Sequence, residues 1–183
     1  MSLFDLVILF LVLANCTPLL VQQNVDGSNS FDRSWEEFKA GFNNTNGNYW
    51  LGNDLLHQLT NIGPYKLRFD LQLRANLSWY YAEYLSFVVG NEASNYRLSA
   101  SGYWGNIGDA FSSENGMMFT TYDRDNDLRS GTNCAAYSGG GFWYNSCHRA
   151  GVNNARGHGQ RFRWYTNEHA NVWLQSTRMW LMC

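Results

Sequence analysis

The run from Asp123 to Asp127 reads Asp-Arg-Asp-Asn-Asp and so places a carboxylate at every second position. Carboxylate oxygens held this close together in a turn-prone segment are typical ligands of a hard cation such as Ca²⁺. An EF-hand is excluded, because that loop needs Gly at its sixth position and Glu at its twelfth, where this chain has Leu128 and Cys134. The alternative is a solvated loop whose Asp and Asn side chains cap their own backbone.

Two short helices are predicted upstream of the acidic run. Ser34 followed by Glu37 forms the pattern of a capping box, and Gly41 is a typical helix stop. A second helix is expected to begin at Asn53 or Asp54. Its buried side is expected to carry Leu55, Leu56 and Leu59.

Two strands are predicted to pair across a turn at Ala75-Asn76. Residues from Lys66 to Arg74 alternate between apolar and polar, which is typical of a half-buried antiparallel strand. Residues from Trp79 to Val89 are its expected partner. Beyond Gly90, Gly and Asn recur so often that long regular elements are not expected. Any functional site in this part of the chain is therefore predicted to lie on loops.

The composition indicates one folded domain of 183 residues, long enough to bury a core. The formal net charge is -2 and the pI is near 6.0, so the sequence gives no basic footprint for nucleic acid or acidic membranes. Aromatic residues reach 16% and charged residues only 15%. This balance predicts a loop-rich fold with aromatic platforms rather than a disordered chain.

Residues 1–20 are expected to be an apolar leader similar to the h-region of a signal peptide, with residues 21–183 forming the domain. The leader is too short to predict a membrane span, and a mis-joined gene is the competing explanation. Two candidate N-glycosylation sequons, Asn43-Asn44-Thr45 and Asn76-Leu77-Ser78, suit a secretory route. A secreted, extracellular glycoprotein is therefore predicted.

Several segments together resemble the fibrinogen-related domain, the family of fibrinogen chains, ficolins, tachylectins, angiopoietins and tenascins. They are Val25–Ser28, Trp35–Phe42, Tyr49–Asp54, Leu67–Leu71, Tyr81–Tyr84, Met117–Asp127, Asn133–Ala135 and Phe142–His148. The resemblance implies an α+β fold with a central antiparallel sheet, short helices and a loop-rich C-terminal calcium and ligand subdomain. The family's usual N-terminal subdomain, with its own cysteine pair, is not found in the sequence.

The resemblance implies a Ca²⁺ site in the acidic run. The carboxylates of Asp125 and Asp127 are its expected ligands, together with the backbone carbonyls of Arg129 and Gly131. Asp123 is expected to accept hydrogen bonds beside them. This chain has one residue more than most relatives between Asp127 and the next cysteine.

The resemblance also implies a disulfide between Cys134 and Cys147. In an oxidising compartment this pair would close a loop whose chain entropy is worth roughly 3 kcal/mol. Cys16 would leave with the leader. Cys183 then remains as an odd cysteine, which is expected to be either a free thiol or bonded to another chain.

The ligand pocket of the lectin members lies beside the metal, next to the peptide that precedes the second cysteine. That peptide is cis in several relatives, which implies a cis Ser146-Cys147 bond here. His148 resembles the pocket histidine that contacts acetyl groups, although a lone His is more often a hydrogen-bonded structural residue. The other expected ligand-binding residues are Ser146, Cys147, Tyr137, Ser138 and Trp164, with the aromatic rings of Tyr137 and Trp164 expected to accept the methyl of an acetyl group. Two features depart from the family: Ser138 replaces an aromatic residue, and the segment Gly151–Phe162 is shorter than usual.

The sequence bears on three classes of function. The first is a Ca²⁺-dependent lectin-like module that binds acetylated glycans in innate immunity, and the second is a protein-binding ectodomain of the angiopoietin or tenascin type. Fibrin-type knob binding is not expected, because Tyr137 and Ser138 supply no acidic group. An enzyme is not predicted, since the sequence holds no HExxH or GxSxG motif around its four histidines. Formation of a homo-oligomer is left open.

Overall fold

The structure is a computed structural model that describes residues 17–157, 162–166 and 170–183. The strands are β1 (Leu19–Asn24), β2 (Phe42–Asn43), β3 (Tyr49–Trp50), β4 (Lys66–Leu73), β5 (Trp79–Val89), β6 (Leu98–Gly105), β7 (Phe119–Thr120), β8 (Phe142–Trp143), β9 (Arg163–Thr166) and β10 (Ala170–Met182). The α-helices are α2 (Trp35–Ala40), α3 (Asn53–Thr60) and α4 (Cys134–Ser138), and the 3₁₀ helices are η1 (Asn29–Phe31), η2 (Glu92–Ser94) and η3 (Phe111–Glu114). None of the helices in these ranges has the length and apolar character that a membrane span needs.

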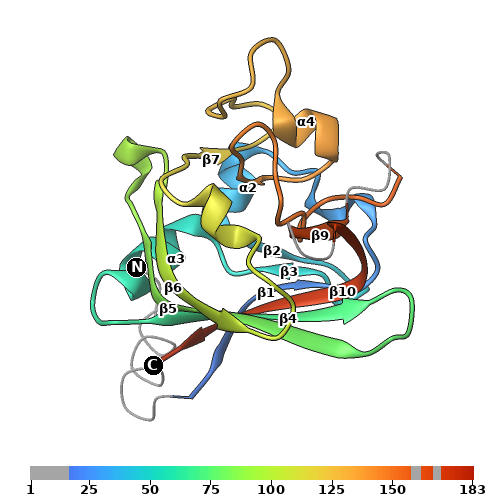
Figure 1. Ribbon diagram of the computed structural model, residues 1–183. Coiled ribbons are helices and arrows are strands. Elements are labelled where there is room, and N and C mark those ends of the chain that lie inside the picture. The colour runs from blue at the N-terminus through green and yellow to red at the C-terminus, as the bar shows by residue number, and fades with distance from the viewer. Residues whose placement is uncertain (1–16, 158–161, 167–169) are drawn as a thin grey trace.

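One antiparallel sheet forms the base of the domain, with strand order β2-β3-β1-β10-β4-β5-β6 and with β9 paired to β10 (Figure 1). The C-terminal strand β10 lies between β1 and β4, in the middle of the sheet. The prediction that no long regular element follows Gly90 is therefore wrong, because both β6 and β10 do. The apolar alternation is broken in β10 by Ser176 and Thr177, which are buried, and its partner strands lie far away in the sequence.

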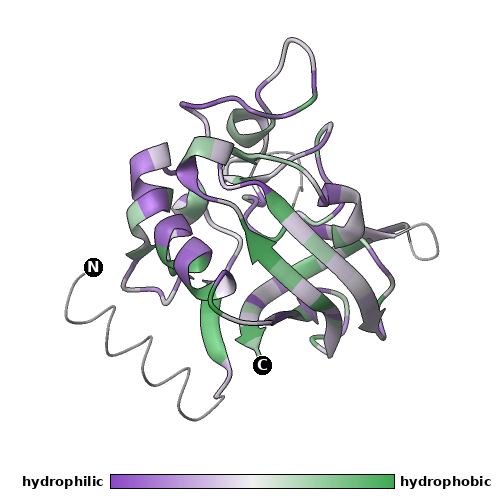
Figure 2. Cartoon of the chain, turned by 90° about the vertical axis from the view of Figure 1, so that its left-hand side faces the viewer, coloured by the Kyte–Doolittle hydropathy of each residue, from purple (hydrophilic) through white to green (hydrophobic). Residues whose placement is uncertain are grey.

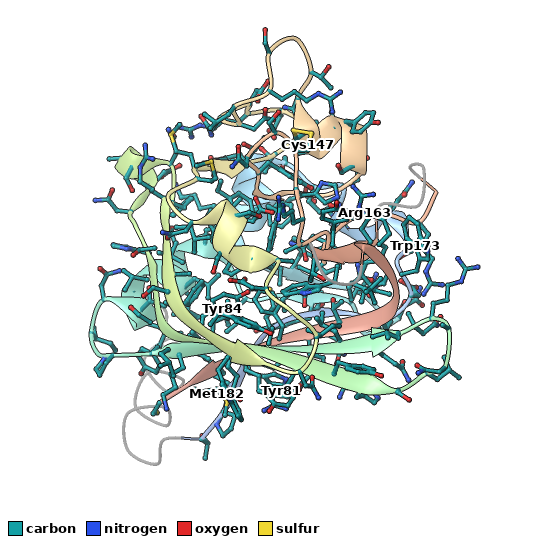
Figure 3. All side chains as sticks on the ribbon, viewed as in Figure 1. Tyr81, Tyr84, Cys147, Arg163, Trp173 and Met182 are labelled. Atoms are coloured by element: carbon teal, nitrogen blue, oxygen red, sulfur yellow. A yellow bond between two sulfur atoms is a disulfide. The ribbon has the colours of Figure 1, made fainter. Side chains whose placement is uncertain are left out.

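The predicted pair of strands is confirmed as β4 and β5, which are antiparallel neighbours in the sheet. The inward side chains of β4, Leu67, Phe69 and Leu71, are fully buried. Figure 3 shows the same alternation on β5, where Tyr84 lies on the inner side of the sheet and Tyr81 on the outer side. In Figure 2 the strands carry long hydrophobic stretches, whereas the helices show both hydrophilic and hydrophobic turns.

The two predicted helices are confirmed as α2 and α3. Ser34 and Glu37 form the capping box: the Ser34 N–H donates to Glu37 Oε2 at 2.9 Å, and the Glu37 N–H donates to Ser34 Oγ at 3.4 Å. Gly41 ends α2 with a φ of +88°, and a Cβ atom there would lie 2.5 Å from the Leu51 carbonyl oxygen. Only glycine satisfies both conditions without strain. On α3, Leu56 and Leu59 are fully buried and Leu55 packs at the edge of the core.

An aromatic cluster above the sheet joins β8 to the rest of the core. Trp143 is fully buried, with its ring centroid 5.2 Å from that of Phe119 and 6.1 Å from that of Trp50. Its Nε1 donates to the Tyr96 carbonyl oxygen at 2.7 Å. Since β7 and β8 pair with each other, this cluster fixes the two strand ends from which the acidic run and the segment 145–148 continue.

The N-terminal boundary of the domain differs from the prediction. Leu19 and Leu20, assigned to the leader, belong to β1 and pair with Leu181 and Trp180 of β10. Residues 1–16 lie outside the described residues, so the leader itself stays a prediction. Cys183 is disulfide-bonded, and none of the described cysteines is free. The alternative of a free thiol at Cys183 is therefore wrong.

Candidate functional site

The acidic run leaves β7 and is fastened to the start of α4 through Asp127. Its Oδ1 accepts a hydrogen bond from the Arg129 N–H at 2.8 Å, and its Oδ2 accepts one from the Cys134 N–H at 2.7 Å. Asp125 Oδ1 accepts from the Asp127 N–H at 3.3 Å. The loop therefore brings the Asp125 and Asp127 carboxyl groups together at one turn, as the resemblance implies.

The charges of this turn fit a bound cation. Burial raises the pKa of Asp127, the Cys134 and Arg129 N–H groups lower it, and the neighbouring Asp125 carboxyl group raises it further. Two adjacent carboxylates repel each other, and a cation between them removes that repulsion. Among the described residues no group of three or more His, Cys, Asp or Glu side chains gathers at one point. The expected carbonyls of Arg129 and Gly131 would therefore have to complete the oxygen set that Ca²⁺ takes.

Asp123 connects the acidic run to α2 instead of facing the other two aspartates. Its Oδ1 accepts hydrogen bonds from the Trp35 N–H at 2.9 Å and from the Thr121 hydroxyl at 2.7 Å. The next side chain, Arg124, lies with its guanidinium carbon 3.9 Å from the centre of the Trp35 ring. These contacts anchor the beginning of the acidic run to the first turn of α2.

A disulfide and a backbone hydrogen bond join the acidic run to segment 145–148. Cys134 and Cys147 are bonded, with their Cα atoms 5.4 Å apart. The Leu128 N–H donates to the Asn145 carbonyl oxygen at 3.0 Å. The Ser146-Cys147 peptide bond is cis. Any change that moves the acidic run must therefore also move the backbone around Cys147.

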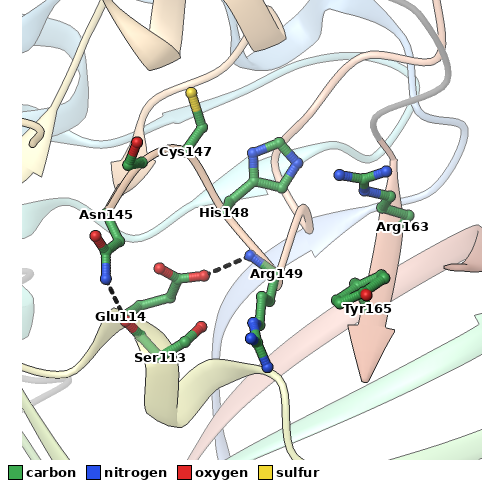
Figure 4. Close-up of a pocket in the computed structure, with 9 residues that line it drawn as sticks. Ser113, Glu114, Asn145, Cys147, His148, Arg149, Arg163 and Tyr165 are labelled. Atoms are coloured by element: carbon green, nitrogen blue, oxygen red, sulfur yellow. Dashed lines mark hydrogen bonds between the residues drawn. The ribbon is translucent and has the colours of Figure 1, made fainter. Parts of the chain in front are cut away.

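A polar pocket of about 360 Å³ opens beside this disulfide (Figure 4). It is lined by Ser113, Glu114, Asn145, Ser146, Cys147, His148, Arg149, Arg163 and Tyr165. Three elements supply these residues: η3, the segment after β8, and β9. Three of the expected ligand-binding residues, Ser146, Cys147 and His148, are among them.

The other three expected ligand-binding residues do not line the pocket. Trp164 is fully buried beneath it, with its Nε1 donating to the Gly108 carbonyl oxygen at 2.9 Å. Ser138 is also fully buried, at the end of α4. Tyr137 is exposed, and its ring lies 5.1 Å from the guanidinium carbon of Arg129. The aromatic wall expected from Tyr137 and Trp164 is therefore not formed by these side chains.

His148 is held by a chain of polar groups behind the pocket. Its Nε2 lies 2.8 Å from the Asn154 amide nitrogen, and the Asn154 amide oxygen lies 2.7 Å from the Tyr144 hydroxyl. The Tyr144 and His148 rings are also in edge contact, with centroids 5.6 Å apart. This arrangement fixes the imidazole orientation at the pocket wall.

Glu114 is a pocket residue that sequence reasoning missed. Its side chain is fully buried, and its Oε1 accepts hydrogen bonds from the N–H groups of Arg149 at 2.7 Å and Ala150 at 3.3 Å. Burial raises the pKa of Glu114 to about 7, although the hydrogen bonds from Arg149 and Ala150 lower it. A single Glu in a turn-rich Ser-Ser-Glu-Asn-Gly segment gives no pattern from which this position could have been found.

Substituting Glu114→Gln is expected to change how stability depends on pH. Because the folded-state pKa lies above the ordinary value of 4.5, the wild-type free energy of unfolding should fall as the pH rises from about 5 to 8. The difference in the free energy of unfolding between Glu114→Gln and wild type should grow by up to about 3 kcal/mol over that pH range. Urea denaturation of both proteins at several pH values measures it. Parallel stability curves would contradict a buried, titrating carboxyl group.

Comparisons with known proteins agree with this architecture. Residues 14–182 match the family described as fibrinogen beta and gamma chains, C-terminal globular domain. Human angiopoietin-related protein 2 is 45% identical over 128 residues, which cover 70% of this chain and 26% of that protein. The fibrinogen beta chain of Gallus gallus is 37% identical over 194 residues, covering 88% of this chain and 42% of that protein. The chain thus spans less than half the length of these relatives.

Solved structures show the same fold. The fibrinogen-like globe domain of human ANGPTL2 superposes with a TM-score of 0.78 at 38% identity, covering 90% of this chain and 79% of that one. Lamprey fibrin D-dimer, solved with the peptide ligand Gly-His-Arg-Pro-amide, superposes with a TM-score of 0.75 at 30% identity, covering 89% and 60% of the two chains. The expected α+β fold with a central antiparallel sheet is confirmed, and the chain belongs to the fibrinogen C-terminal globular domain family.

Proposed function

We propose that this chain is the recognition domain of a secreted protein, and that it binds a segment of another extracellular protein in the pocket beside the Cys134–Cys147 disulfide. One observation carries the proposal: the pocket is lined by the charged side chains Glu114, Arg149 and Arg163. Charged groups suit the varied polar groups of a peptide better than a neutral sugar substituent. The similarity to angiopoietin-related proteins, and to a fibrin solved with a bound peptide, supports the same choice.

Acetylated glycans are the second candidate. This candidate is supported by His148 and the cis Ser146-Cys147 peptide, which lie beside the pocket. However, Tyr137 and Trp164, which were to accept the methyl group, are not in the pocket. The protein-binding hypothesis is therefore preferred. Members of this family are not enzymes, and the expectation that this chain is not one is confirmed.

Substituting His148→Ala is expected to weaken binding of a protein or peptide ligand about tenfold or more, because the imidazole is fixed at the pocket wall. The measurement is a binding titration of ligands found on parallel peptide and glycan arrays. Tyr137→Ala is the matched control, since Tyr137 is exposed outside the pocket. Equal loss of affinity in His148→Ala and Tyr137→Ala would contradict binding in this pocket. Binding of the wild-type protein to acetylated sugars alone would replace the protein-binding proposal by the lectin one.

We further propose Ca²⁺ as the cation of the acidic run, held by the carboxylates of Asp125 and Asp127 with carbonyls near Arg129 and Gly131. The bound ion would neutralise the two carboxylates and order the turn. This turn would position the pocket, because Leu128 is hydrogen-bonded to Asn145 and Cys134 is disulfide-bonded to Cys147. Calcium is therefore expected to support ligand binding without touching the ligand.

The calcium proposal predicts a change in thermal stability that depends on the metal. At a Ca²⁺ concentration a hundredfold above its dissociation constant, binding adds about 2.7 kcal/mol to the wild-type protein, or roughly 5 to 10 °C in melting temperature. Asp127→Ala should lose most of this increase, whereas Glu36→Gln, which changes an exposed acid on α2, should keep it. The measurement is scanning calorimetry of the three proteins at increasing Ca²⁺ concentration. An equal rise in melting temperature in all three would rule out this site.

Secretion is proposed on independent grounds. Cys134, Cys147 and Cys183 are all in disulfides, and disulfides persist mainly in oxidising compartments. Both sequon asparagines are exposed: Asn43 on β2, and Asn76 in the turn between β4 and β5. The turn around Asn76 is an Asx turn, in which the Asn76 amide oxygen accepts a hydrogen bond from the Ser78 N–H at 3.0 Å. Glycans at these positions would lie away from the pocket lining.

A further inference from the structure

A second pocket, of about 580 Å³, lies at the hairpin formed by β2 and β3, beside β1 at one end of the sheet (Figure 1). We call it the hairpin pocket. Its lining consists of Leu20, Tyr49 and five Asn, Thr and Gly residues between positions 43 and 48, none of which carries a charge. Its volume lies within the range of about 300 to 1,000 Å³ that is typical of ligand pockets. The hairpin pocket therefore suits a neutral ligand with both polar and apolar groups.

Asn43 lines this pocket and begins a glycosylation sequon, whereas the next residue, Asn44, is used by the fold. The Asn44 amide oxygen accepts a hydrogen bond from the Asn48 N–H at 3.0 Å, and its amide nitrogen donates to the Ser30 hydroxyl at 2.9 Å. Asn43 and Thr45, the two residues that define the sequon, are both exposed. The Asn43 amide group is therefore accessible for attachment of a glycan.

Tyr49 is the aromatic residue of the hairpin pocket and the direct cross-strand neighbour of Asn43. Side chains in such a pair lie on the same face of the sheet, with their Cβ atoms about 4.5 to 5.5 Å apart. The C–H groups on one face of a sugar ring pack against the electron-rich face of an aromatic ring. Leu20 of β1 adds apolar surface to the same pocket. A sugar on the Asn43 amide nitrogen is thus placed beside an aromatic surface that suits it.

The backbone around the hairpin pocket is held before any sugar is attached. The Gly47 N–H donates to the Asn44 carbonyl oxygen at 3.1 Å, and the Gly47 carbonyl oxygen accepts a hydrogen bond from Gln23 Nε2 at 2.9 Å. Asn48 is buried, and its amide oxygen accepts a hydrogen bond from the Val25 N–H at 2.8 Å. A sugar in the pocket therefore gains contacts without having to order the hairpin.

We propose that Asn43 carries an N-glycan whose first N-acetylglucosamine docks in the hairpin pocket against the Tyr49 ring. This proposal rests on the proposed secretion and is independent of the ligand pocket beside the disulfide. Attachment to Asn43 keeps the sugar at a high effective concentration, so that even a weak contact is occupied. Because β2 is an edge strand of the sheet, the docked glycan also blocks pairing of this edge with another chain.

The test uses the full chain expressed in a eukaryotic secretory cell line that adds high-mannose glycans. Peptide mass spectrometry of the secreted protein should find Asn43 modified in wild type and unmodified in Thr45→Ala. The melting temperature of Thr45→Ala should be about 2 to 4 °C lower than that of wild type, the shift that one lost contact gives in a domain of this size. Wild type trimmed by an endoglycosidase to the first sugar should keep this difference.

Tyr49→Ala identifies the contact that the sugar makes. In the Tyr49→Ala protein, adding Thr45→Ala should lower the melting temperature by less than about 1 °C, since the ring that binds the sugar is gone. Ser78→Ala is the matched control, because it removes the sequon of Asn76 in the turn between β4 and β5. Its effect on the melting temperature should be the same with and without Tyr49.

Four results would overturn the inference while leaving secretion intact. They are an unmodified Asn43 in the secreted protein, loss of the difference on trimming to the first sugar, an equal effect of Thr45→Ala with and without Tyr49, and a dependence of the Ser78→Ala effect on Tyr49 as large as that of Thr45→Ala. Retention of the chain inside the cell would overturn the proposed secretion and the inference together.

A further readout uses trimmed wild type alone, in case Tyr49→Ala does not fold. Nuclear Overhauser contacts are expected between the protons of the first N-acetylglucosamine and the ring protons of Tyr49. Sugar protons that show contacts only to Asn43 would overturn the inference.

Discussion

Substituting Trp143→Ala is expected to lower the free energy of unfolding by about 3 to 5 kcal/mol, the range for removing a fully buried tryptophan. The substitution empties the centre of the aromatic cluster that includes Phe119 and Trp50, and it leaves the Tyr96 carbonyl oxygen without its donor. Because β8 leads directly into segment 145–148, ligand binding should be lost at the same time. Urea denaturation with the Ca²⁺ concentration held constant measures the stability.

Trp104→Ala is the matched control for this loss. Trp104 is 59% exposed on the edge strand β6, and its ring packs near that of Tyr81. Its removal should cost less than about 1 kcal/mol. Similar losses in the two variants would show that the cluster around Trp143 is not the core that supports the site.

Removal of the disulfide is expected to have the next largest effect. The double substitution Cys134→Ala with Cys147→Ala releases a loop with a sequence separation of 13 residues, which corresponds to about 3 kcal/mol of stability. The substituted loop should also lose its order, because the hydrogen bond from the Leu128 N–H to the Asn145 carbonyl oxygen then has to join the acidic run to segment 145–148 without the covalent link. Ligand affinity and calcium affinity are therefore expected to fall together.

Calcium and ligand titrations of the double variant, below its unfolding transition, separate these effects. Retention of wild-type affinities at reduced stability would show that the disulfide stabilises the fold without organising the pocket. Reduction of the wild-type protein by a mild thiol, followed by the same titrations, is an independent check without any substitution.

The sequence predicted those helices and strands that are determined by interactions between residues close together in the chain. The capping box at Ser34, the glycine stop at Gly41 and the strict alternation of β4 each act within a few residues, so the sequence displays them directly. β10 was missed because its interior includes the polar residues Ser176 and Thr177. The Thr177 hydroxyl is satisfied by residues distant in the sequence: Gln22 Nε2 donates to it at 3.1 Å, and it donates to the Val152 carbonyl oxygen at 3.3 Å. Such tertiary pairing leaves no periodic signal.

The candidate site was predictable to a similar extent. Resemblance singled out the acidic run and His148 as candidates, because these motifs are contiguous in the sequence. Trp164 is buried and does not line the pocket, which the sequence does not reveal because a pocket aromatic and a core aromatic look the same in sequence. Glu114 was missed because its role comes from η3 folding against Arg149, a contact across 35 residues.

The most direct test of the proposed recognition site is a backbone amide chemical-shift map of the protein titrated with a selected peptide in the presence of Ca²⁺. The largest shifts are expected at Ser113 and Glu114, at residues 145–149, and at Arg163 and Tyr165, which line the pocket. Figure 3 shows Tyr81 on the opposite side of the domain from Cys147. Shifts confined to Tyr81 and the neighbouring outer surface of the sheet, with none around Cys147, would contradict recognition at this pocket.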